Sequence, residues 1–205
     1  MKTANEALEL LRQGNHRFSN SLLDREVLAS RSPRDNFIEH QRPHTIILGC
    51  SDSRVPAEMV FDQGLGDLFV VRVAGNVIAP VQVGSVEFAA SQFGTRLVVV
   101  LGHTQCGAVN AAIQSIRQPQ VEHSSNVSAI VDSIRPHIVD LVEEDKGAED
   151  STLAHQAVRA NVRAAVDHLR NSSQVLESLI VSEGLRVVGA EYDIKTGNVE
   201  FLDDV

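Results

Sequence analysis

Short apolar runs alternate along the chain with longer stretches in which apolar residues recur at helical spacing. The runs at 45–48, 67–73, 96–101 and 185–194 are rich in branched apolar residues, which is typical of strands buried on both faces of a sheet. The amphipathic stretches predict helices at 3–20, 56–64, 80–94, 108–117, 126–144, 152–169 and 173–182. Because strands and helices alternate, we expect an α/β fold with a mainly parallel central β-sheet flanked by helices.

The N-terminal helix at 3–20 stands apart from the core strands in sequence. It could pack on its own domain or reach across to a partner subunit. Residues 21–43 are polar and interrupted by prolines, with one helical turn expected near 36–40. The predicted organisation is a single domain over 1–205, with a helical arm at 1–35, an α/β core at 36–205 and an edge strand at 199–202.

Composition narrows the class of protein. The chain has 205 residues, enough for one sizeable α/β domain, and a net charge of −9 argues against a nucleic-acid partner. No apolar stretch approaches the roughly 18 residues of a membrane span. The N-terminus lacks the uninterrupted apolar region of a signal peptide, so a cytoplasmic location is expected by default.

Candidate chemistry is concentrated where two of the apolar runs end. The first run is followed by Cys50-x-Asp52-x-Arg54, and the third by His103-x-x-Cys106. The carboxyl ends of strands are the usual site of an open α/β sheet. A single buried cysteine is usually a small core residue. Two cysteines and a histidine at strand ends instead predict a zinc site whose fourth position stays open for water.

Two thiolates cancel the charge of the zinc ion, so a further group must favour or hold a bound hydroxide. Asp52 can accept a hydrogen bond from it, and Arg54 can hold Asp52 ionised through a bidentate pair. Two alternatives stay open. Asp52 could itself be a fourth ligand that closes the site, or the two residues could form an ordinary loop ion pair.

The segments GCSDSRVPAEMVFDQGLGDLFVVRVAGN at 49–76 and VVLGHTQCGAVNAA at 99–112 resemble those of the β-class carbonic anhydrases. The resemblance covers residues 3–120 well and the C-terminal strands more loosely. It implies one Zn²⁺ per subunit, bound by Cys50, His103 and Cys106, with Asp52 and Arg54 as the catalytic dyad. The implied reaction is reversible hydration of carbon dioxide to bicarbonate and a proton, by attack of zinc-bound hydroxide.

The resemblance also implies a substrate pocket and an assembly. Its expected residues are Gln41 from the neighbouring subunit, the backbone N–H of Gly107, and the apolar side chains Phe69, Val71, Ala74 and Phe88. For the two phenylalanines, plain core packing is an equally good interpretation. The family forms dimers with active sites at the interface, often assembled into tetramers, so a homodimer or homotetramer is expected.

One departure from the family pattern indicates a subgroup. The bicarbonate-inhibited enzymes carry a tryptophan three residues before the first cysteine, where this chain has Ile47. We therefore expect the plant-like subgroup with a constitutively open site. Two alternative functions remain: hydrolysis of carbon disulfide or carbonyl sulfide on the same fold, and a non-catalytic protein with an enclosed structural zinc.

Overall fold

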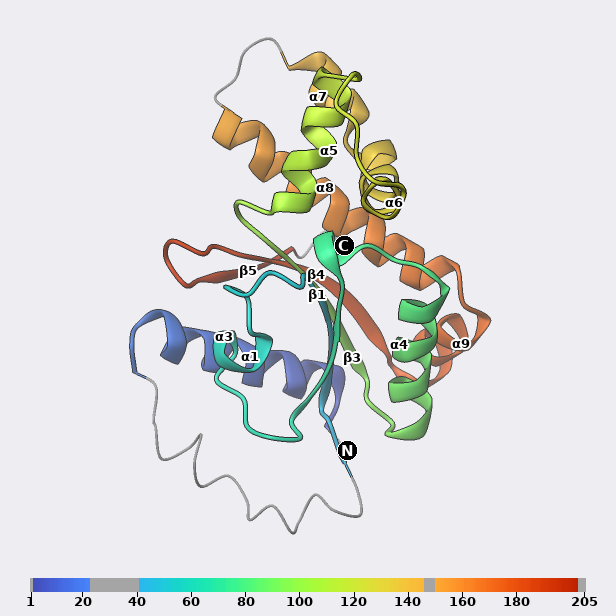
Figure 1. The fold of residues 1–205 in the computed structure, drawn as a ribbon. Coiled ribbons are helices and arrows are strands. Elements are labelled where there is room, and N and C mark those ends of the chain that lie inside the picture. Colours follow the sequence, from blue (N-terminus) through green and yellow to red (C-terminus); the bar gives the residue numbers. More distant parts are fainter. Residues whose placement is uncertain (1, 23–40, 146–149, 203–205) are drawn as a thin grey trace.

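A single sheet forms the centre of the computed structural model, which describes residues 2–22, 41–145 and 150–202 (Figure 1). Within these residues the strands are β1 (Thr45–Gly49), β2 (Leu68–Arg72), β3 (Leu97–His103), β4 (Arg186–Tyr192) and β5 (Val199–Leu202). Their order is β2-β1-β3-β4-β5, with only β5 antiparallel to its neighbour. The predicted mainly parallel sheet and its C-terminal edge strand are confirmed.

The helices follow the sequence pattern with two corrections. They are α1 (Ala4–Ser19), α3 (Ala57–Val60), α4 (Pro80–Gln92), α5 (Gly107–Arg117), α6 (Ser125–Ile134), α7 (Val139–Glu144), α8 (Asp150–Asn171) and α9 (Gln174–Glu183). The helix expected at 126–144 is divided by a 3₁₀ turn, η3 (Arg135–His137), because Pro136 cannot continue the α-helical hydrogen bonding. The helix expected at 56–64 is a single turn. The turn expected near 36–40 lies outside the described residues.

Two apolar cores hold the helices against opposite faces of the sheet. Side chains of β1 and β3 alternate between the faces, so Ile46 and Leu48 face α4, α8 and α9, whereas Ile47 faces α1 and α3. All three are fully buried. This two-sided burial explains why the parallel strands read as continuous apolar runs in the sequence.

A third apolar cluster covers the carboxyl ends of the parallel strands. It is formed by α5, α6, α7 and α8, which stand above the sheet in Figure 1, and it contains Cys50 and Cys106. The strand ends that carry the candidate ligands are therefore enclosed by helices. An apolar enclosure of this kind strengthens electrostatic interactions between the groups inside it.

Helix α1 packs on its own chain in the structure. A capping box between Thr3 and Glu6 begins the helix. Further along, the buried Asn15 amide donates to the carbonyl oxygens of Val60 at 3.1 Å and Gly197 at 2.8 Å. A role for this helix in contacting a second subunit stays a prediction.

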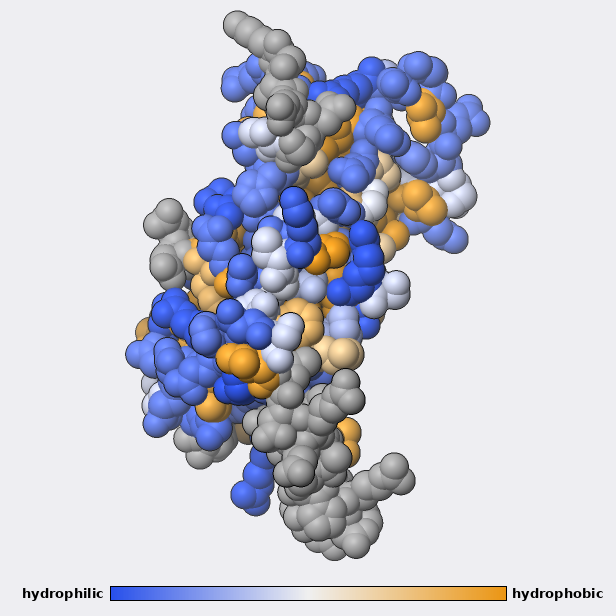
Figure 2. Space-filling model, turned by 90° about the vertical axis from the view of Figure 1, so that its left-hand side faces the viewer, coloured by the Kyte–Doolittle hydropathy of each residue, from blue (hydrophilic) through white to orange (hydrophobic). Residues whose placement is uncertain are grey.

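Hydrophilic residues dominate the face that includes α1, with hydrophobic residues in separate patches (Figure 2). None of the described helices has both the length and the apolar character that crossing a membrane requires.

Two glycines give a test of the packing between α1 and α3. A Cβ at Gly14 of α1 would overlap the carbonyl oxygen of Phe61, whereas one at Gly84 of α4 would meet no atom within 4 Å. We expect Gly14→Ala to destabilise the protein by about 2–3 kcal/mol through overpacking. Gly84→Ala should stabilise it by about 0.5–1 kcal/mol through helix propensity. Urea unfolding measures both, and equal effects would contradict the described packing.

Candidate metal centre and active site

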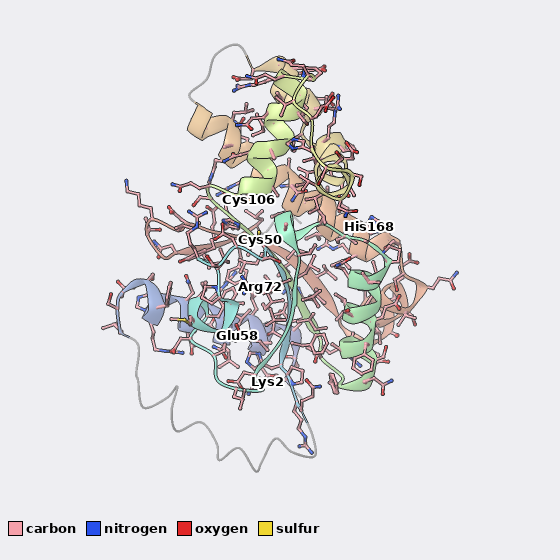
Figure 3. The ribbon with its side chains drawn as sticks, viewed as in Figure 1. Lys2, Cys50, Glu58, Arg72, Cys106 and His168 are labelled. Carbon is pink, nitrogen blue, oxygen red and sulfur yellow. The ribbon has the colours of Figure 1, made fainter. Side chains whose placement is uncertain are left out.

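Three candidate ligands meet at the carboxyl ends of two neighbouring strands. Cys50 follows β1, His103 ends β3, and Cys106 directly precedes α5. Their ligand atoms all lie within 4.8 Å of one another, and all three residues are buried. Figure 3 shows Cys50 and Cys106 together between the sheet and α5. Because β1 and β3 pair in parallel, with Gly49 opposite Leu101, their ends necessarily lie side by side.

The protonation of His103 suits a metal ligand. Its Nδ1 lies 2.9 Å from the carbonyl oxygen of Thr104, and since a carbonyl only accepts, Nδ1 must carry the proton. The Nε2 lone pair is then directed into the group, and it is buried without a hydrogen-bonding partner among the described residues. An unpaired buried polar atom is costly, and a bound cation beside two sulfurs would satisfy it. The residues present therefore fit a Zn²⁺ ion.

Cys50 and Cys106 lose one proton between them easily, but the second proton is held tightly. A hydrogen bond from Cys106 lowers the pKa of Cys50 to about 4, although burial opposes this. The same hydrogen bond, with burial adding to it, raises the pKa of Cys106 above its usual value. Backbone N–H groups of Asp52 and Gly75 also point at the Cys50 sulfur, at 3.4 and 3.3 Å. One thiolate thus forms readily, and the second needs a cation nearby.

Asp52 is held beside the three ligands by Arg54. Arg54 Nε donates to Oδ1 at 2.9 Å and Nη2 donates to Oδ2 at 2.7 Å, which is a bidentate pair. These hydrogen bonds hold the pKa of Asp52 well below its usual range. Asp52 Oδ2 also lies 3.9 Å from His103 Nε2. In the structure Arg54 holds both carboxylate oxygens of Asp52, an arrangement expected of the dyad and of an ordinary loop ion pair, but not of Asp52 as a fourth ligand.

Two arginines connect the loops around the centre, and one of them was missed in the sequence. Arg72, at the end of β2, donates from Nε to the Cys50 carbonyl oxygen at 3.0 Å and from Nη2 to that of Asp52 at 2.6 Å. Arg54 reaches the carbonyl oxygen of Gln105 at 3.3 Å, in the loop between His103 and Cys106. Arg72 could have been recognised in the sequence as the single charged residue at the end of the apolar run that precedes Ala74.

The expected pocket residues divide into two groups. Ala74 immediately precedes Gly75, which contacts the Cys50 sulfur, and Gly107 follows Cys106 at the start of α5. These two lie at the centre. Val71 pairs with Leu48, two residues before Cys50 along β1.

The other three expected residues are not beside the centre of their own chain. Phe69 pairs with Ile46, about 13 Å along β1 from Cys50 at the usual rise of a strand. Phe88 packs against Phe69 with ring centroids 6.4 Å apart. Gln41 precedes the amino end of β1, whereas Cys50 follows its carboxyl end. A second subunit would have to supply these side chains, if they act at the site.

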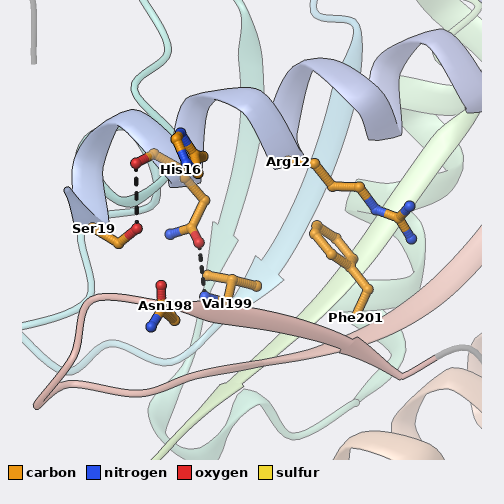
Figure 4. Close-up of a pocket in the computed structure, with 7 residues that line it drawn as sticks. Arg12, His16, Ser19, Asn198, Val199 and Phe201 are labelled. Carbon is orange, nitrogen blue, oxygen red and sulfur yellow. Dashed lines mark hydrogen bonds between the residues drawn. The ribbon is translucent and has the colours of Figure 1, made fainter. Parts of the chain in front are cut away.

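A separate hollow of about 330 Å³ lies between α1 and β5 (Figure 4). Arg12 lies over the Phe201 ring there, 5.4 Å from its centroid, and the backbone N–H of Val199 donates to Asn15 Oδ1 at 2.8 Å. None of the expected site residues lines this hollow. It is a different place from the metal centre.

Comparison with known proteins agrees with this geometry. Residues 45–199 match the family model described as "Carbonic anhydrase". Carbonic anhydrase 2 of Mycobacterium tuberculosis is 35% identical over 202 residues, covering 97% of this chain and 93% of that protein. The carbonic anhydrase of Mycolicibacterium smegmatis is 36% identical over 167 residues, covering 82% and 78%.

Solved structures share the fold. A tetrameric β-carbonic anhydrase of Sordaria macrospora superposes with a TM-score of 0.78 at 22% identity, covering 90% of this chain and 92% of that one. The β-carbonic anhydrase CafA of Aspergillus fumigatus gives 0.76 at 25% identity, covering 92% of each chain.

A mainly parallel sheet whose strand ends present a buried Cys-His-Cys group beside an aspartate–arginine pair defines an α/β protein with a site that could hold a metal ion. The chain belongs to the carbonic anhydrase family, and within it to the β class. It is a lyase that catalyses the reversible hydration of carbon dioxide to bicarbonate and a proton.

The Asp52–Arg54 pair yields a prediction for Arg54→Ala. Without the guanidinium, Asp52 loses both side-chain hydrogen bonds that orient it, so we expect kcat/KM for hydration to fall about 10- to 100-fold. Arg117→Ala is the matched control, because Arg117 pairs with Asp145 outside the site. Stopped-flow assays with metal analysis measure the effect, and unchanged activity of Arg54→Ala would count against the dyad.

The pH dependence of the Arg54→Ala variant shows whether its activity falls because Asp52 is misoriented or because Asp52 becomes protonated. Arg54 lowers the pKa of Asp52, so its removal raises that pKa toward the usual value of about 4. Asp52 then remains ionised at pH 6 and at pH 8. We therefore expect Arg54→Ala to lose the same factor at both pH values. A loss that grows from pH 8 to pH 6 would show instead that the carboxyl group becomes protonated.

Proposed function

We propose that the bound metal is Zn²⁺, one per subunit, held by Cys50, His103 and Cys106. The donor set supports this choice, since two thiolates and one imidazole with an open fourth position are typical of catalytic zinc. When bound, Zn²⁺ lowers the pKa of a coordinated water and so supplies a nucleophile near neutral pH.

The residues around the metal then orient the reaction. Asp52 accepts a hydrogen bond from the nucleophile and directs its lone pair toward carbon dioxide, while Arg54 keeps the carboxylate ionised and turned away from the ligand position. The exposed Gly107, directly after Cys106, offers its backbone N–H to an oxygen of the substrate or of bicarbonate. The proton leaves to buffer through the exposed side of the site.

We propose that the active enzyme is a homodimer or homotetramer in which a neighbouring subunit completes the pocket with Gln41, Phe69 and Phe88. The exposed apolar surface beside β2 supports this, because β2 is an edge strand and Phe88 remains 53% exposed next to it. The Sordaria macrospora relative is described as tetrameric. A cytoplasmic location completes the proposal.

The open, plant-like subgroup is favoured by the packing of Ile47. This side chain is fully buried in the core between β1 and α1, where a tryptophan would need considerably more space. An enclosed structural zinc would need Asp52 as its fourth protein ligand. Arg54 binds both carboxylate oxygens of Asp52, which disfavours this alternative. The relatives are named carbonic anhydrases, which favours carbon dioxide over its sulfur analogues.

Removal of one ligand tests the proposed metal. Cys106→Ala leaves two donors, so we expect zinc content well below one per chain and loss of hydration activity. Val109→Ala is the control, because it shortens a buried side chain one turn further along α5 and keeps all three donors. Metal analysis and stopped-flow hydration are measured on the same preparations. Full activity of metal-free wild-type protein would contradict the proposal.

A charge on the apolar edge tests the assembly. Phe88→Glu places a carboxylate in the proposed interface, so we expect smaller species in sedimentation velocity and a parallel loss of activity. Val181→Glu is the matched control, since Val181 is also an exposed apolar residue, 88% exposed, but lies on a different helix, α9. A monomeric wild type with full activity, or an unchanged assembly in Phe88→Glu, would overturn this part of the proposal.

A further inference from the structure

One polar side chain interrupts the apolar face that α8 packs against the sheet. Asn161 is 4% exposed, although burying an amide among apolar groups is unfavourable unless its hydrogen bonds are made. Its buried neighbours on the same helix are Ala157, Val158, Val162, Ala165 and Val166. A buried amide at this position is therefore expected to have a specific hydrogen-bonding partner.

The partner is a backbone carbonyl beside the metal centre. Asn161 Nδ2 donates to the carbonyl oxygen of Gly75 at 2.9 Å, a contact between residues 86 positions apart in sequence. The N–H of the same glycine donates to the Cys50 sulfur at 3.3 Å. Gly75 is thus held from both sides, by a side chain of α8 and by a candidate metal ligand.

The position of Gly75 leaves no room for a side chain. Its φ of +67° is a backbone conformation that favours glycine. A Cβ there would lie 2.8 Å from Ile134 Cδ1 and 2.9 Å from Ala108 Cβ. The segment therefore fits one narrow slot, and the hydrogen bond from Asn161 determines how the residue is oriented within it.

We propose that Asn161 is a positioning residue for the metal centre, which keeps the Gly75 N–H on the Cys50 sulfur and so adjusts the electron density that this sulfur shares with the metal. This inference rests on the proposed Zn²⁺ site. A hydrogen bond to a thiolate stabilises its charge and fixes its direction, as outer partners of metal ligands generally do. Helix α8 then contributes to the centre without supplying a ligand.

Replacement of Asn161 should change the metal centre in two measurable ways. Asn161→Leu removes the donor at similar volume, and the Gly75 N–H is then free to turn from the sulfur. We expect zinc affinity, measured by competition with a chelator, to weaken about tenfold. In the cobalt-substituted enzyme, the thiolate-to-metal charge-transfer band should move to lower energy, because the sulfur electrons are less stabilised.

Matched variants separate this effect from a loss of packing. Val166, five residues further along α8, is fully buried in the core facing α4 and α9, and Val166→Ala should leave affinity and band position unchanged. Asn161→Ala, which only truncates the side chain, should shift both readouts in the same direction as Asn161→Leu and serves if the leucine variant does not fold.

The outcomes distinguish this inference from the proposed function. If wild type binds zinc and both Asn161 variants keep wild-type affinity and band position, the inference is wrong and the zinc proposal stands. If both readouts shift equally in Val166→Ala, the effect is packing alone and the inference is also wrong. If wild type is fully active without metal, the proposed function fails.

Discussion

The constraint on which this structure depends is the crowding of three electron-rich atoms in an apolar enclosure. Two sulfurs and an imidazole nitrogen lie within 4.8 Å of one another, and all three residues are buried under a layer of helices. In such surroundings charge repulsion is weakly screened, and each unpaired polar atom is costly. The neighbouring groups relieve this in separate ways: backbone N–H groups point at Cys50, and Arg54 neutralises Asp52.

The fold makes this crowding possible through its parallel strands. Adjacent parallel strands end at the same edge, so two segments about fifty residues apart deliver their terminal side chains to one point. The two ends are tied to each other by the hydrogen bond from Arg54 to the Gln105 carbonyl oxygen, and to two further elements by Arg72 of β2 and Asn161 of α8. The ligand geometry is thus supported by most of the domain, although the ligands come from two short loops.

The sequence predicted local features well and distant ones poorly. Apolar runs predicted β1 and β3, and the residues at their carboxyl ends predicted the candidate ligands that the structure brings together, because a strand and its end depend mainly on neighbouring residues. Arg72 and Asn161 were not recognised, since their roles depend on contacts made after the sheet and α8 are assembled. Phe69 and Phe88 were expected at the pocket, but they pack on each other away from their own chain's centre. The residue pattern of one chain does not show which of its side chains would lie at a subunit interface.

The Asp52 carboxylate near His103 has a consequence for the end of the catalytic cycle. With Zn²⁺ and two thiolates the ligand set would carry no net charge, and the bidentate pair with Arg54 balances the charge of the adjacent carboxylate. A neutral gas can enter such a centre without an electrostatic barrier, whereas an anionic product gains little by staying.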